Sequence, residues 1–438
     1  MSEAYPYLPE GWYKPNLDEL GSICTGNTPP TSDQSNYGGA LPFVGPSDLG
    51  RGRWINSCSE RLTRKGELLS RTADKDAVLV SCIGILGKVG QASERLSFNQ
   101  QINSMQPNKE KVDAGFLYYA SSRLQGELNK LAGLQVVPIV NKTLFSKLEV
   151  LAPKNLEEQR WIANVLNTLD TQIQKTEALI AKLEKVKEGL LHDLLTRGID
   201  ENDQLRPSPE QAPERYKESQ LGLGLVPREW ACVAIGETAT STTLGTANRG
   251  AESSAKTKLI KMGNLNWGNT LSLINVESIS ARKVHGSLFL SDADLLFNTR
   301  NTPELVGKTC SWKGDGAFFT FDNNILRIRF SENLNGHFVA SYMSGDIGRR
   351  RIGRLATGTT SVAAIYWRSL SRLEVPMPSP DEQQLIVDKV NSSQDNINAL
   401  NDDLTSLQRL KAGLMDDLLT GRVRVTPLLD QAQITTPA

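Results

Sequence analysis

Apolar residues recur every three or four positions through two long stretches of this chain, residues 155–197 and 379–421. The series in the first stretch is Leu166, Leu169, Ile173, Ile180, Leu183, Lys187, Leu190 and Leu194. The series in the second stretch is Val390, Ile397, Leu400, Leu404, Leu407, Lys411, Leu414 and Leu418. A spacing of about 3.5 residues is typical of a coiled-coil seam, so we predict two helices of roughly 60 Å that pack on each other.

Both stretches carry signals for where a helix begins and ends. Asn155 and Ser379 are good N-cap residues, and Glu158 and Glu382 follow them at the capping-box spacing. Each stretch is followed by a glycine that can adopt the left-handed conformation of a helix end, Gly198 and Gly421. We therefore predict that each helix begins at its polar cap and ends at its glycine.

The two stretches are copies of one another. Residues 148–196 and 373–420 share Leu-Glu-Val, a proline, Glu-Gln and a final Leu-Leu-Thr. Corresponding residues lie 225 positions apart at the start and 224 apart from Glu158 onward. If the copies are related by a two-fold axis, as most self-complementary pairs are, the two helices run antiparallel. The sequence thus predicts an internal two-fold pseudo-symmetry.

Two polar or small residues recur inside the copies. A lysine occupies the same seam position in each, Lys187 and Lys411, and polar seam residues often fix the register of a coiled coil. Gly189 and Gly413 also coincide. Because a glycine inside a helix costs about 1 kcal/mol relative to alanine, its recurrence suggests close approach by another surface. A drifted duplicate in which the glycine has no role is an equally simple reading.

The segments before the two helices also match, more loosely. Pro9–Trp12 corresponds to Pro227–Trp230, and residues 76–80 (DAVLV) correspond to residues 293–297 (ADLLF). Short strands are predicted at residues 78–82, 295–297, 318–321 and 325–330, and helices at 116–131 and 336–354. The fold class is therefore α+β, with two similar domains that have β-rich cores and that two long antiparallel helices separate.

The predicted boundaries follow from these matches. They are a first domain at 1–154, a first helix at 155–197, a linker at 198–226, a second domain at 227–378, a second helix at 379–421 and a C-terminal tail at 422–438. Matching anchors with polar loops that differ between the copies are what a pair of recognition domains needs.

Composition narrows the class of protein. The formal net charge is +0, which counts against a nucleic-acid binder, although arginines cluster at residues 349–354. The sequence has no run of about 18 apolar residues and no signal peptide, and its five cysteines lack a CxxC pair. We expect a chain that resides in the reducing cytoplasm, without a membrane span and without a metal site.

No catalytic motif is complete. Residues 302–309 (TPELVGKT) end like a phosphate-binding loop, but Thr302 stands where the first glycine belongs. Gly84, Gly87 and Gly90 lack dinucleotide-binding spacing. No Ser-His-Asp or Cys-His set can be proposed from the three histidines and five cysteines. We expect that the chain alone catalyses nothing.

The repeated pattern resembles a known family. Two variable domains that each open with Pro-x-x-Trp and close with Leu-Glu-Val, a proline and Glu-Gln before a long helix are similar to the specificity (S) subunits of type I restriction–modification systems, the HsdS family. The resemblance covers nearly the whole chain and is most specific at residues 148–162 and 373–386. Residues 358–365 (GTTSVAAI) also resemble the family's small-residue loop, while the first copy departs from it at residues 133–136.

The resemblance implies a division of labour. Each variable domain would be a target-recognition domain that reads one half of a bipartite, asymmetric DNA site, and the helices would set the spacing between the halves. Two methyltransferase (M) subunits would dock on the chain, and restriction (R) subunits would join the full complex. The assembled complex would have adenine-N6 DNA methyltransferase and ATP-dependent endonuclease activity. We expect no cofactor on this chain, with S-adenosylmethionine, ATP and Mg on the partner subunits.

Candidate DNA-binding residues are basic, amide, hydroxyl or aromatic side chains in the loops, because such groups grip phosphates, read base edges or stack on bases. In the first domain they are Arg51, Arg53, Trp54, Lys88, Gln100 and Gln101. In the second they are Lys261, Asn264, Asn266, Trp267, Arg300, Asn301, Arg349, Arg350, Arg351, Arg354, Thr359 and Thr360. Tryptophans that only pack and amides that only close turns are the competing interpretation of the same residues.

Three other functions stay open at this point. A non-enzymatic coiled-coil scaffold with two ligand-binding domains and no nucleic acid fits the neutral charge. An enzyme with an unrecognised site is a second possibility. A specificity chain that serves a type II-like system is a third, and only the neighbouring subunits would distinguish it.

Overall fold

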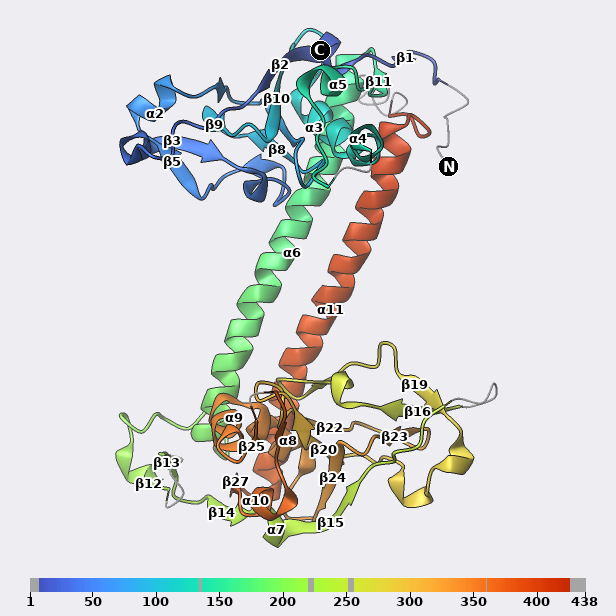
Figure 1. The fold of residues 1–438 in the computed structure, drawn as a ribbon. Helices are drawn as coiled ribbons and strands as arrows, with labels where there is room; N and C mark the ends of the chain where they lie inside the picture. The colour runs from blue at the N-terminus through green and yellow to red at the C-terminus, as the bar shows by residue number, and fades with distance from the viewer. Residues whose placement is uncertain (1–7, 134–135, 220–223, 251–255, 360, 426–438) are drawn as a thin grey trace, which may run out of the picture. The chain divides into compact units, whose positions relative to one another are not determined.

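The computed structural model describes residues 8–133, 136–219, 224–250, 256–359 and 361–425 (Figure 1). The chain divides into two compact units. Unit 1 comprises Met1–Leu179 and Asn401–Ala438, and unit 2 comprises Ile180–Leu400. Each unit therefore contains one of the two matching domains together with a segment from each of the two long helices.

The domain of unit 1 is built on two sheets. The larger has the strand order β2 (Gly21–Thr25), β10 (Ile102–Pro107), β7 (Val78–Ser81), β8 (Val89–Ala92) and β4 (Trp54–Ile55). The smaller has the order β5 (Glu60–Leu62), β3 (Tyr37–Val44), β9 (Leu96–Phe98) and β6 (Thr72–Ala73). β1 (Trp12–Tyr13) pairs with β11 (Ala152–Pro153), so the opening Pro-x-x-Trp segment lies against the segment that leads into the first long helix.

The domain of unit 2 repeats this frame. Its main sheet has the order β15 (Ala239–Leu244), β24 (Ile325–Phe330), β20 (Leu295–Asn298) and β22 (Thr309–Ser311), which corresponds to β2–β10–β7–β8. A second sheet has the order β19 (Glu277–Ile279), β16 (Thr257–Ile260) and β23 (Phe319–Phe321), and a third has β21 (Arg300–Asn301), β26 (Ala363–Ala364) and β25 (Thr357–Gly358). Smaller pairs are β12 (Tyr216–Glu218) with β13 (Leu225–Pro227), β14 (Ala231–Ala234) with β27 (Glu374–Met377), and β17 (Leu265–Asn266) with β18 (Thr270–Leu271).

Short helices cover one face of each main sheet. α3 (Ala114–Ser122) packs on β7 and β8, and α8 (Gly336–Ser344) packs on β20, β22 and β24. The other short helices are α1 (Leu17–Leu20), α2 (Arg64–Leu68), α4 (Gln125–Ala132), α5 (Lys142–Ser146), α7 (Ile235–Thr238), α9 (Asp346–Gly353) and α10 (Trp367–Leu370). In each unit the sheet, the covering helix and the long-helix segments share one core, since Leu166 and Leu418 join Phe116 in unit 1 and Leu194 and Val390 join Phe338 in unit 2.

The sequence predicted the strands more accurately than the short helices. The strands expected near residues 78–82, 295–297, 318–321 and 325–330 are β7, β20, β23 and β24. The single helices expected at 116–131 and 336–354 were wrong, because each is two helices. The break in the second falls at Gly345, whose extended backbone (φ −71°, ψ 165°) lies outside the helical region.

The two long helices are α6 (Leu156–Thr196) and α11 (Pro380–Leu419). The caps are as predicted: Asn155 Oδ1 accepts from Glu157 N at 2.8 Å, and Ser379 Oγ accepts from Glu382 N at 3.3 Å. Gly198 and Gly421, with φ of +68° and +69°, adopt the left-handed conformation beyond the helix ends. The predicted start and stop signals of both helices are therefore confirmed.

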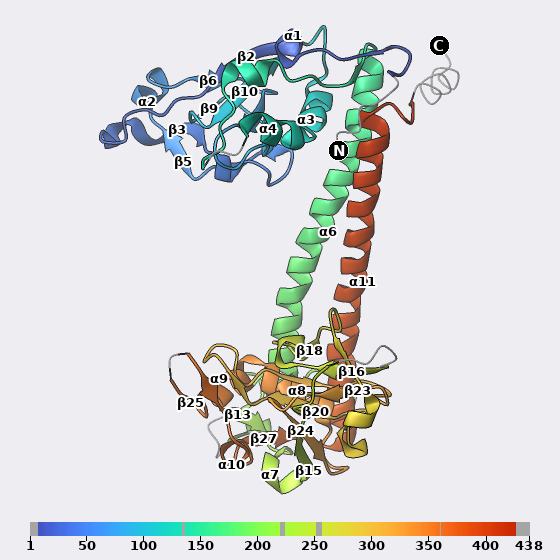
Figure 2. The ribbon, with the colours of Figure 1, turned by 45° about the vertical axis from the view of Figure 1, so that its right-hand side comes forward.

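Within each unit the segments of α6 and α11 run antiparallel (Figure 2). In unit 1, Glu158 at the start of α6 meets Arg424 just after α11, and Asp170 meets Lys411 further along. In unit 2, Lys187 meets Gln394, and Ile199 just after α6 meets Glu382 at the start of α11. Every predicted seam residue is buried or half-buried, although their mutual packing as a seam stays a prediction.

The structure confirms the predicted fold class, a repeated α+β architecture with two long helices. The domain boundaries given above stay predictions. Among the described residues, no helix is long and apolar enough to cross a bilayer.

Candidate nucleic-acid interface and its supporting frame

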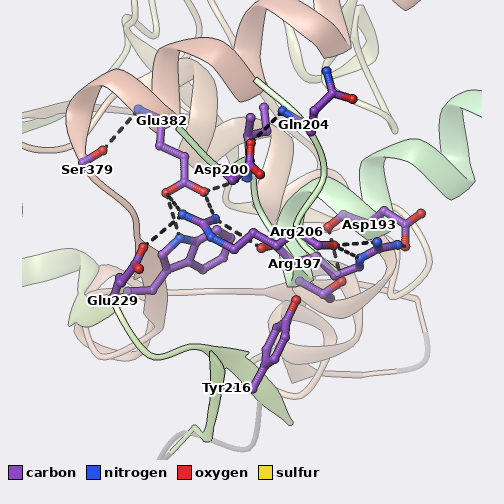
Figure 3. Close-up of polar contacts among 12 residues, drawn as sticks. Asp193, Arg197, Asp200, Gln204, Arg206, Tyr216, Glu229, Ser379 and Glu382 are labelled. Carbon is purple, nitrogen blue, oxygen red and sulfur yellow. Dashed lines mark hydrogen bonds and ion pairs between the residues drawn. The ribbon is translucent and has the colours of Figure 1, made fainter. Parts of the chain in front are cut away.

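A buried ion pair ties the start of α11 to the segment after α6 in unit 2 (Figure 3). The Glu382 carboxylate accepts from both Nη atoms of Arg206, with Nη2···Oε2 at 3.1 Å, and from Trp230 Nε1 at 3.1 Å and Ile199 N at 2.9 Å. Burial acts to lower the pKa of Arg206, but the hydrogen bonds and charge of Glu382 raise it more, so its pKa is raised overall. The arginine is therefore held as a cation, in bidentate contact with the carboxylate.

Unit 1 has the equivalent cluster at the start of α6. Arg424 Nε and Nη2 donate to the two carboxylate oxygens of Glu158 at 2.7 and 3.0 Å, and the guanidinium lies 6.0 Å from the centroid of the Trp12 ring. We call these two sets, Glu382–Arg206–Trp230 and Glu158–Arg424–Trp12, the helix-start clusters. The sequence assigned both glutamates to a capping box, but their carboxylates bind arginines from distant segments.

The two seam lysines have different partners. In unit 1, Lys411 Nζ lies 2.5 Å from Asp170 Oδ1, and Tyr119 of α3 donates its hydroxyl to Asp170 Oδ2 at 2.7 Å. Burial, reinforced by the hydrogen bond to Asp170, raises the pKa of Tyr119, so the tyrosine stays a donor. This network connects α11, α6 and the recognition domain of unit 1. In unit 2, Lys187 donates to the neutral Gln394, and burial lowers the lysine's pKa.

The candidate DNA-binding residues near β4 divide into exposed and engaged side chains. Arg51 and Trp54 line a surface hollow of about 200 Å³ together with Asp48, Asn56 and Gln174 of α6. The Arg53 guanidinium is engaged within the unit, because Nε donates to Gln91 Oε1 at 2.6 Å and Nη1 donates to Asn167 Oδ1 at 3.1 Å. It also lies 4.7 Å from the Trp54 ring centroid. Arg53 thus ties the segment that leads into β4 to β8 and to α6.

The remaining candidates in unit 1 lie on other loops. Lys88 is half-buried beside Gly50. Gln100 is exposed, and its Oε1 accepts from Thr28 Oγ1 at 2.5 Å. Gln101 Oε1 accepts from Asn99 Nδ2 at 3.1 Å in a local turn. Their contact with DNA stays a prediction.

In unit 2 the hairpin β17–β18 matches the β4 region of unit 1. Asn264 is buried and closes a turn, since its Oδ1 accepts from Lys261 N at 2.8 Å and its Nδ2 donates to Ser272 O at 3.0 Å. Lys261 itself is paired with Glu277. Asn266 is exposed, and Trp267 is half-buried beneath Arg349, whose guanidinium lies 4.4 Å from the ring centroid.

The arginines of α9 also separate into two kinds. Arg351 points inward, and its Nη1 donates to the Tyr342 hydroxyl at 3.0 Å and to Glu374 O at 2.5 Å. Arg350 is exposed and pairs with Asp346 at 2.6 Å, and Arg354 is exposed. The structure thus brings Arg349, Arg350 and Arg354 to the surface of one helix, with Arg351 as an internal brace.

The last candidates lie on the third sheet of unit 2. Arg300 and Thr359 are exposed, and Asn301 is half-buried with its Oδ1 accepting from Thr302 N at 2.9 Å. Thr360 lies outside the described residues. Arg300 and Asn301 form β21, which pairs with β26 of the small-residue loop.

Sequence reasoning missed residues that the repeat could have indicated. Asn269 binds Ser311 N at 2.8 Å and Ser341 Oγ at 3.2 Å, and so fixes the β17–β18 hairpin as Arg53 fixes its counterpart. It aligns with Arg53 in the two copies. Residues 133–136 depart in sequence from the second copy, but Ile83 is opposite Ile139 as Arg300 is opposite Ala364.

The outer faces of the long helices carry exposed apolar residues at equivalent positions. Val186 and Leu410 are 53% and 52% exposed, and Trp161 and Leu385 are each 38% exposed. A Cβ atom added at Gly189 or Gly413 would meet nothing within 4 Å. The close approach that these glycines suggested is therefore not made among the described residues of the chain. We call these six positions the repeated helix surface.

Comparisons with known proteins support the family identified from the sequence. Residues 9–185 match the family model of the type I restriction modification DNA specificity domain. The chain is 22% identical over 434 residues to the type I restriction enzyme MjaVIII specificity subunit of Methanocaldococcus jannaschii, covering 96% of this chain and 95% of that protein. It is 27% identical over 201 residues to the HindI specificity subunit of Haemophilus influenzae, covering 44% and 42%.

Solved structures show the same fold. The S subunit of the type I restriction–modification system from M. genitalium superposes with a TM-score of 0.59 at 16% identity, covering 95% of this chain and 97% of that one. A chain from a study of complex assembly and conformational transition in the type I R-M system gives a TM-score of 0.55 at 16% identity, covering 95% and 100%. The resemblance to the specificity subunits of type I restriction–modification systems, which are non-catalytic subunits, is thereby confirmed.

Proposed function

We propose that this chain is the DNA specificity subunit of a type I restriction–modification complex, in which each recognition domain reads one half of a bipartite, asymmetric site. The observation that carries this is the repeated frame with unlike surfaces. Both domains use the same main sheet and the same helix-start cluster, whereas their exposed loop residues differ in charge and polarity. Different side chains on one frame are what reading two different base sequences requires.

The exposed candidates are the residues that we propose to contact DNA. They are Arg51, Trp54, Gln100, Asn266, Arg300, Arg349, Arg350, Arg354 and Thr359. Arg53, Asn264 and Arg351 are engaged within their units, so we assign them to positioning the loops. Substituting Arg51 should weaken only one half of the site, and equal loss at both halves would contradict two independent readers.

The long helices would set the spacing of the half-sites and dock two methyltransferase subunits. The repeated helix surface supports this, because exposed apolar residues at equivalent positions of two helices suit two copies of one partner. Restriction subunits would complete an assembly with adenine-N6 methyltransferase and ATP-dependent endonuclease activity, whose S-adenosylmethionine, ATP and Mg would be bound by the partners. Such a complex would act in the cytoplasm.

Native mass spectrometry of the chain with its methyltransferase subunit tests the docking surface. Val186→Glu or Leu410→Glu alone should reduce the number of bound partners from two to one, and the double variant should bind none. Lys175→Glu, at another exposed position of α6, is the matched control. Two bound partners on the double variant would contradict this assignment.

Selection from a random duplex library tests the function as a whole. The chain is incubated with its methyltransferase subunit and S-adenosylmethionine at low salt, and the bound pool is sequenced. Two short blocks separated by a fixed, unread gap are expected. A pool without enrichment would favour a coiled-coil scaffold that does not bind nucleic acid.

A further inference from the structure

Two loops meet at one edge of the recognition domain in unit 1. Ile83, which follows β7, forms an antiparallel bridge with Ile139. The loops are held by backbone hydrogen bonds, from Gly84 N to Pro138 O at 3.0 Å and from Val140 N to Cys82 O at 2.9 Å. This pair of loops is therefore fixed to the buried sheet through its backbone, which leaves its side chains free to vary.

Unit 2 has the same pair of loops. Arg300, which follows β20, is opposite Ala364, and Ala364 is opposite Thr357 across the three strands β21, β26 and β25. Ile365 N donates to Thr299 O at 2.9 Å, as Val140 N does to Cys82 O in unit 1. Since neighbours across a sheet lie on one face, Arg300, Ala364 and Thr357 share the face opposite the buried Ala363.

The two loop pairs occupy equivalent places on the frame. In unit 1, β7 enters the loop from Ser81, which is opposite Ile102 of β10. In unit 2, β20 enters from Asn298, which is opposite Ile325 of β24. Two residues further along each strand, the chain reaches Ile83 and Arg300 respectively. Ile83 and Arg300 are thus structural counterparts, as are Ile139 and Ala364.

The chemistry at this place differs between the units. The loops of unit 1 expose Ile85, Val137 and Ile139, which are 60%, 50% and 44% exposed. The counterpart in unit 2 exposes Arg300 and the hydroxyl-bearing Thr357 beside Ala364, together with Val362, which is 51% exposed. A protein partner that binds both units in the same way would need matching surfaces here, as the repeated helix surface provides. Exposed aliphatic side chains in unit 1, and an arginine and a threonine added at the same place in unit 2, suit a ligand whose two halves differ.

We propose that this loop pair reads bases directly, and that the two units use different side chains to do so. In unit 1 the aliphatic side chains, Ile139 foremost, contact thymine methyl groups in the major groove. In unit 2 the Arg300 guanidinium donates to O6 and N7 of a guanine. These are the base-edge groups that aliphatic and arginine side chains recognise. The inference rests on the proposed function and assigns a base class to each half-site.

Modified bases test the assignment with the assembled complex of this chain and its methyltransferase subunit. Once selection has defined the two blocks, each thymine is replaced by deoxyuridine, which lacks only the methyl group. One replacement in the block read by unit 1 should weaken binding about four-fold, the value of one buried methyl group. Ile139→Ala should weaken the parent duplex similarly and remove the response to deoxyuridine.

The second block is tested with 7-deazaguanine, which lacks the N7 acceptor. One such replacement should weaken binding to the wild-type complex by roughly five-fold or more, and Arg300→Ala should abolish the response, because a bidentate arginine–guanine contact contributes about 5- to 150-fold. Arg282→Ala, an exposed arginine on another loop of unit 2, is the control and should retain the response.

The outcomes separate the two levels of the proposal. A wild-type pool without two blocks would overturn the DNA-specificity function and this inference together. Two blocks whose binding is insensitive to both modified bases, or variants that keep the wild-type response, would overturn the inference alone. Loss of folding is monitored by circular dichroism of each variant, and Ile139→Val, which keeps an aliphatic side chain, should retain the response to deoxyuridine.

Discussion

The seam lysine has a different hydrogen-bond partner in each unit. In unit 1, Lys411 has a carboxylate partner in Asp170, which also accepts from Tyr119. In unit 2, Lys187 donates to the amide of Gln394, at the position that corresponds to Asp170. The helix-start clusters, in contrast, keep a bidentate glutamate–arginine pair in both units. In the cluster of unit 2 both charged side chains are about nine-tenths buried, whereas Lys411 is 26% exposed.

The difference shows which contacts a duplicated fold can vary. A fully buried carboxylate and guanidinium cannot lose one partner without leaving a charge in a low-dielectric site. A half-exposed lysine can exchange its carboxylate for an amide, because water still solvates part of the charge. We therefore expect the cost of breaking each contact to follow the burial of the pair, and the predictions below run from the most buried to the least.

The helix-start clusters should give the largest effects. Glu382→Ala leaves the buried Arg206 with Glu229, a carboxylate that is 78% exposed, and should destabilise the chain by about 3–5 kcal/mol. Glu158→Ala should cost less, because Arg424 is 30% exposed and can regain water. Urea unfolding of the full chain measures both variants. A larger loss for Glu158→Ala would break the proposed dependence on burial.

Breaking the Lys411–Asp170–Tyr119 network of unit 1 should give the second-largest loss of stability. Asp170→Asn removes the carboxylate that binds both Lys411 and Tyr119, and should cost about 1–3 kcal/mol. Adding Lys411→Met should recover part of this loss, because the uncompensated ammonium is then absent. Gln394→Ala in unit 2 is the matched control and should cost less. Equal losses in the two units would show that the charge of Asp170 contributes nothing.

Replacing Gly189 or Gly413 should raise the stability of the chain, whereas the substitutions above lower it. A Cβ at Gly189 or Gly413 meets nothing within 4 Å, so each alanine variant should stabilise the isolated chain by about 1 kcal/mol through helix propensity. If a partner approaches closely there, the same variants should weaken its binding. The free energy of unfolding measures the gain in helix stability, and the affinity for the methyltransferase subunit measures the loss of close approach. An unchanged affinity would support the interpretation that the glycines are a drifted duplicate without a role.

The smallest expected effect is a dependence of stability on pH that arises from Lys187. Burial lowers the pKa of Lys187, so the folded state binds this proton less tightly than the unfolded state does. Stability should therefore rise as the pH increases from the lowered folded pKa toward the ordinary value of 10.5, by under about 1 kcal/mol for a half-exposed group. Lys187→Met should remove this alkaline rise in unfolding midpoint. Lys411→Met, whose wild-type lysine is paired, serves as the comparison.

The long helices could be predicted from sequence because their signal extends over more than ten turns and occurs twice. Caps and terminal glycines then located their ends to within a residue or two. The short helices were predicted less well, since the apolar pattern around Gly345 continues across a break that only the backbone reveals. The partners of Glu158 and Glu382 could not be predicted, because Arg424 and Arg206 lie 266 and 176 positions away.

Site residues show the same limit at the level of single side chains. Arg349, Arg350 and Arg351 are indistinguishable in sequence, yet one covers Trp267, one faces solvent and one braces Tyr342. Successive residues of a helix point in different directions, so the three side chains have different surroundings. Residue type alone does not reveal this difference. The Ile83–Ile139 bridge was missed for the converse reason, because aliphatic side chains do not stand out as ligands for DNA.

The discontinuity of unit 1 has a consequence for the order of folding during synthesis. Unit 2 is one continuous segment, whereas unit 1 needs residues from Asn401 onward to cover Leu166 and to supply the arginine that binds Glu158. At 5–20 residues per second, roughly 10 to 45 seconds separate the emergence of its two parts from the ribosome. During that interval the nascent first domain has an apolar face of α6 uncovered, and we expect a chaperone that binds exposed apolar segments to bind it there.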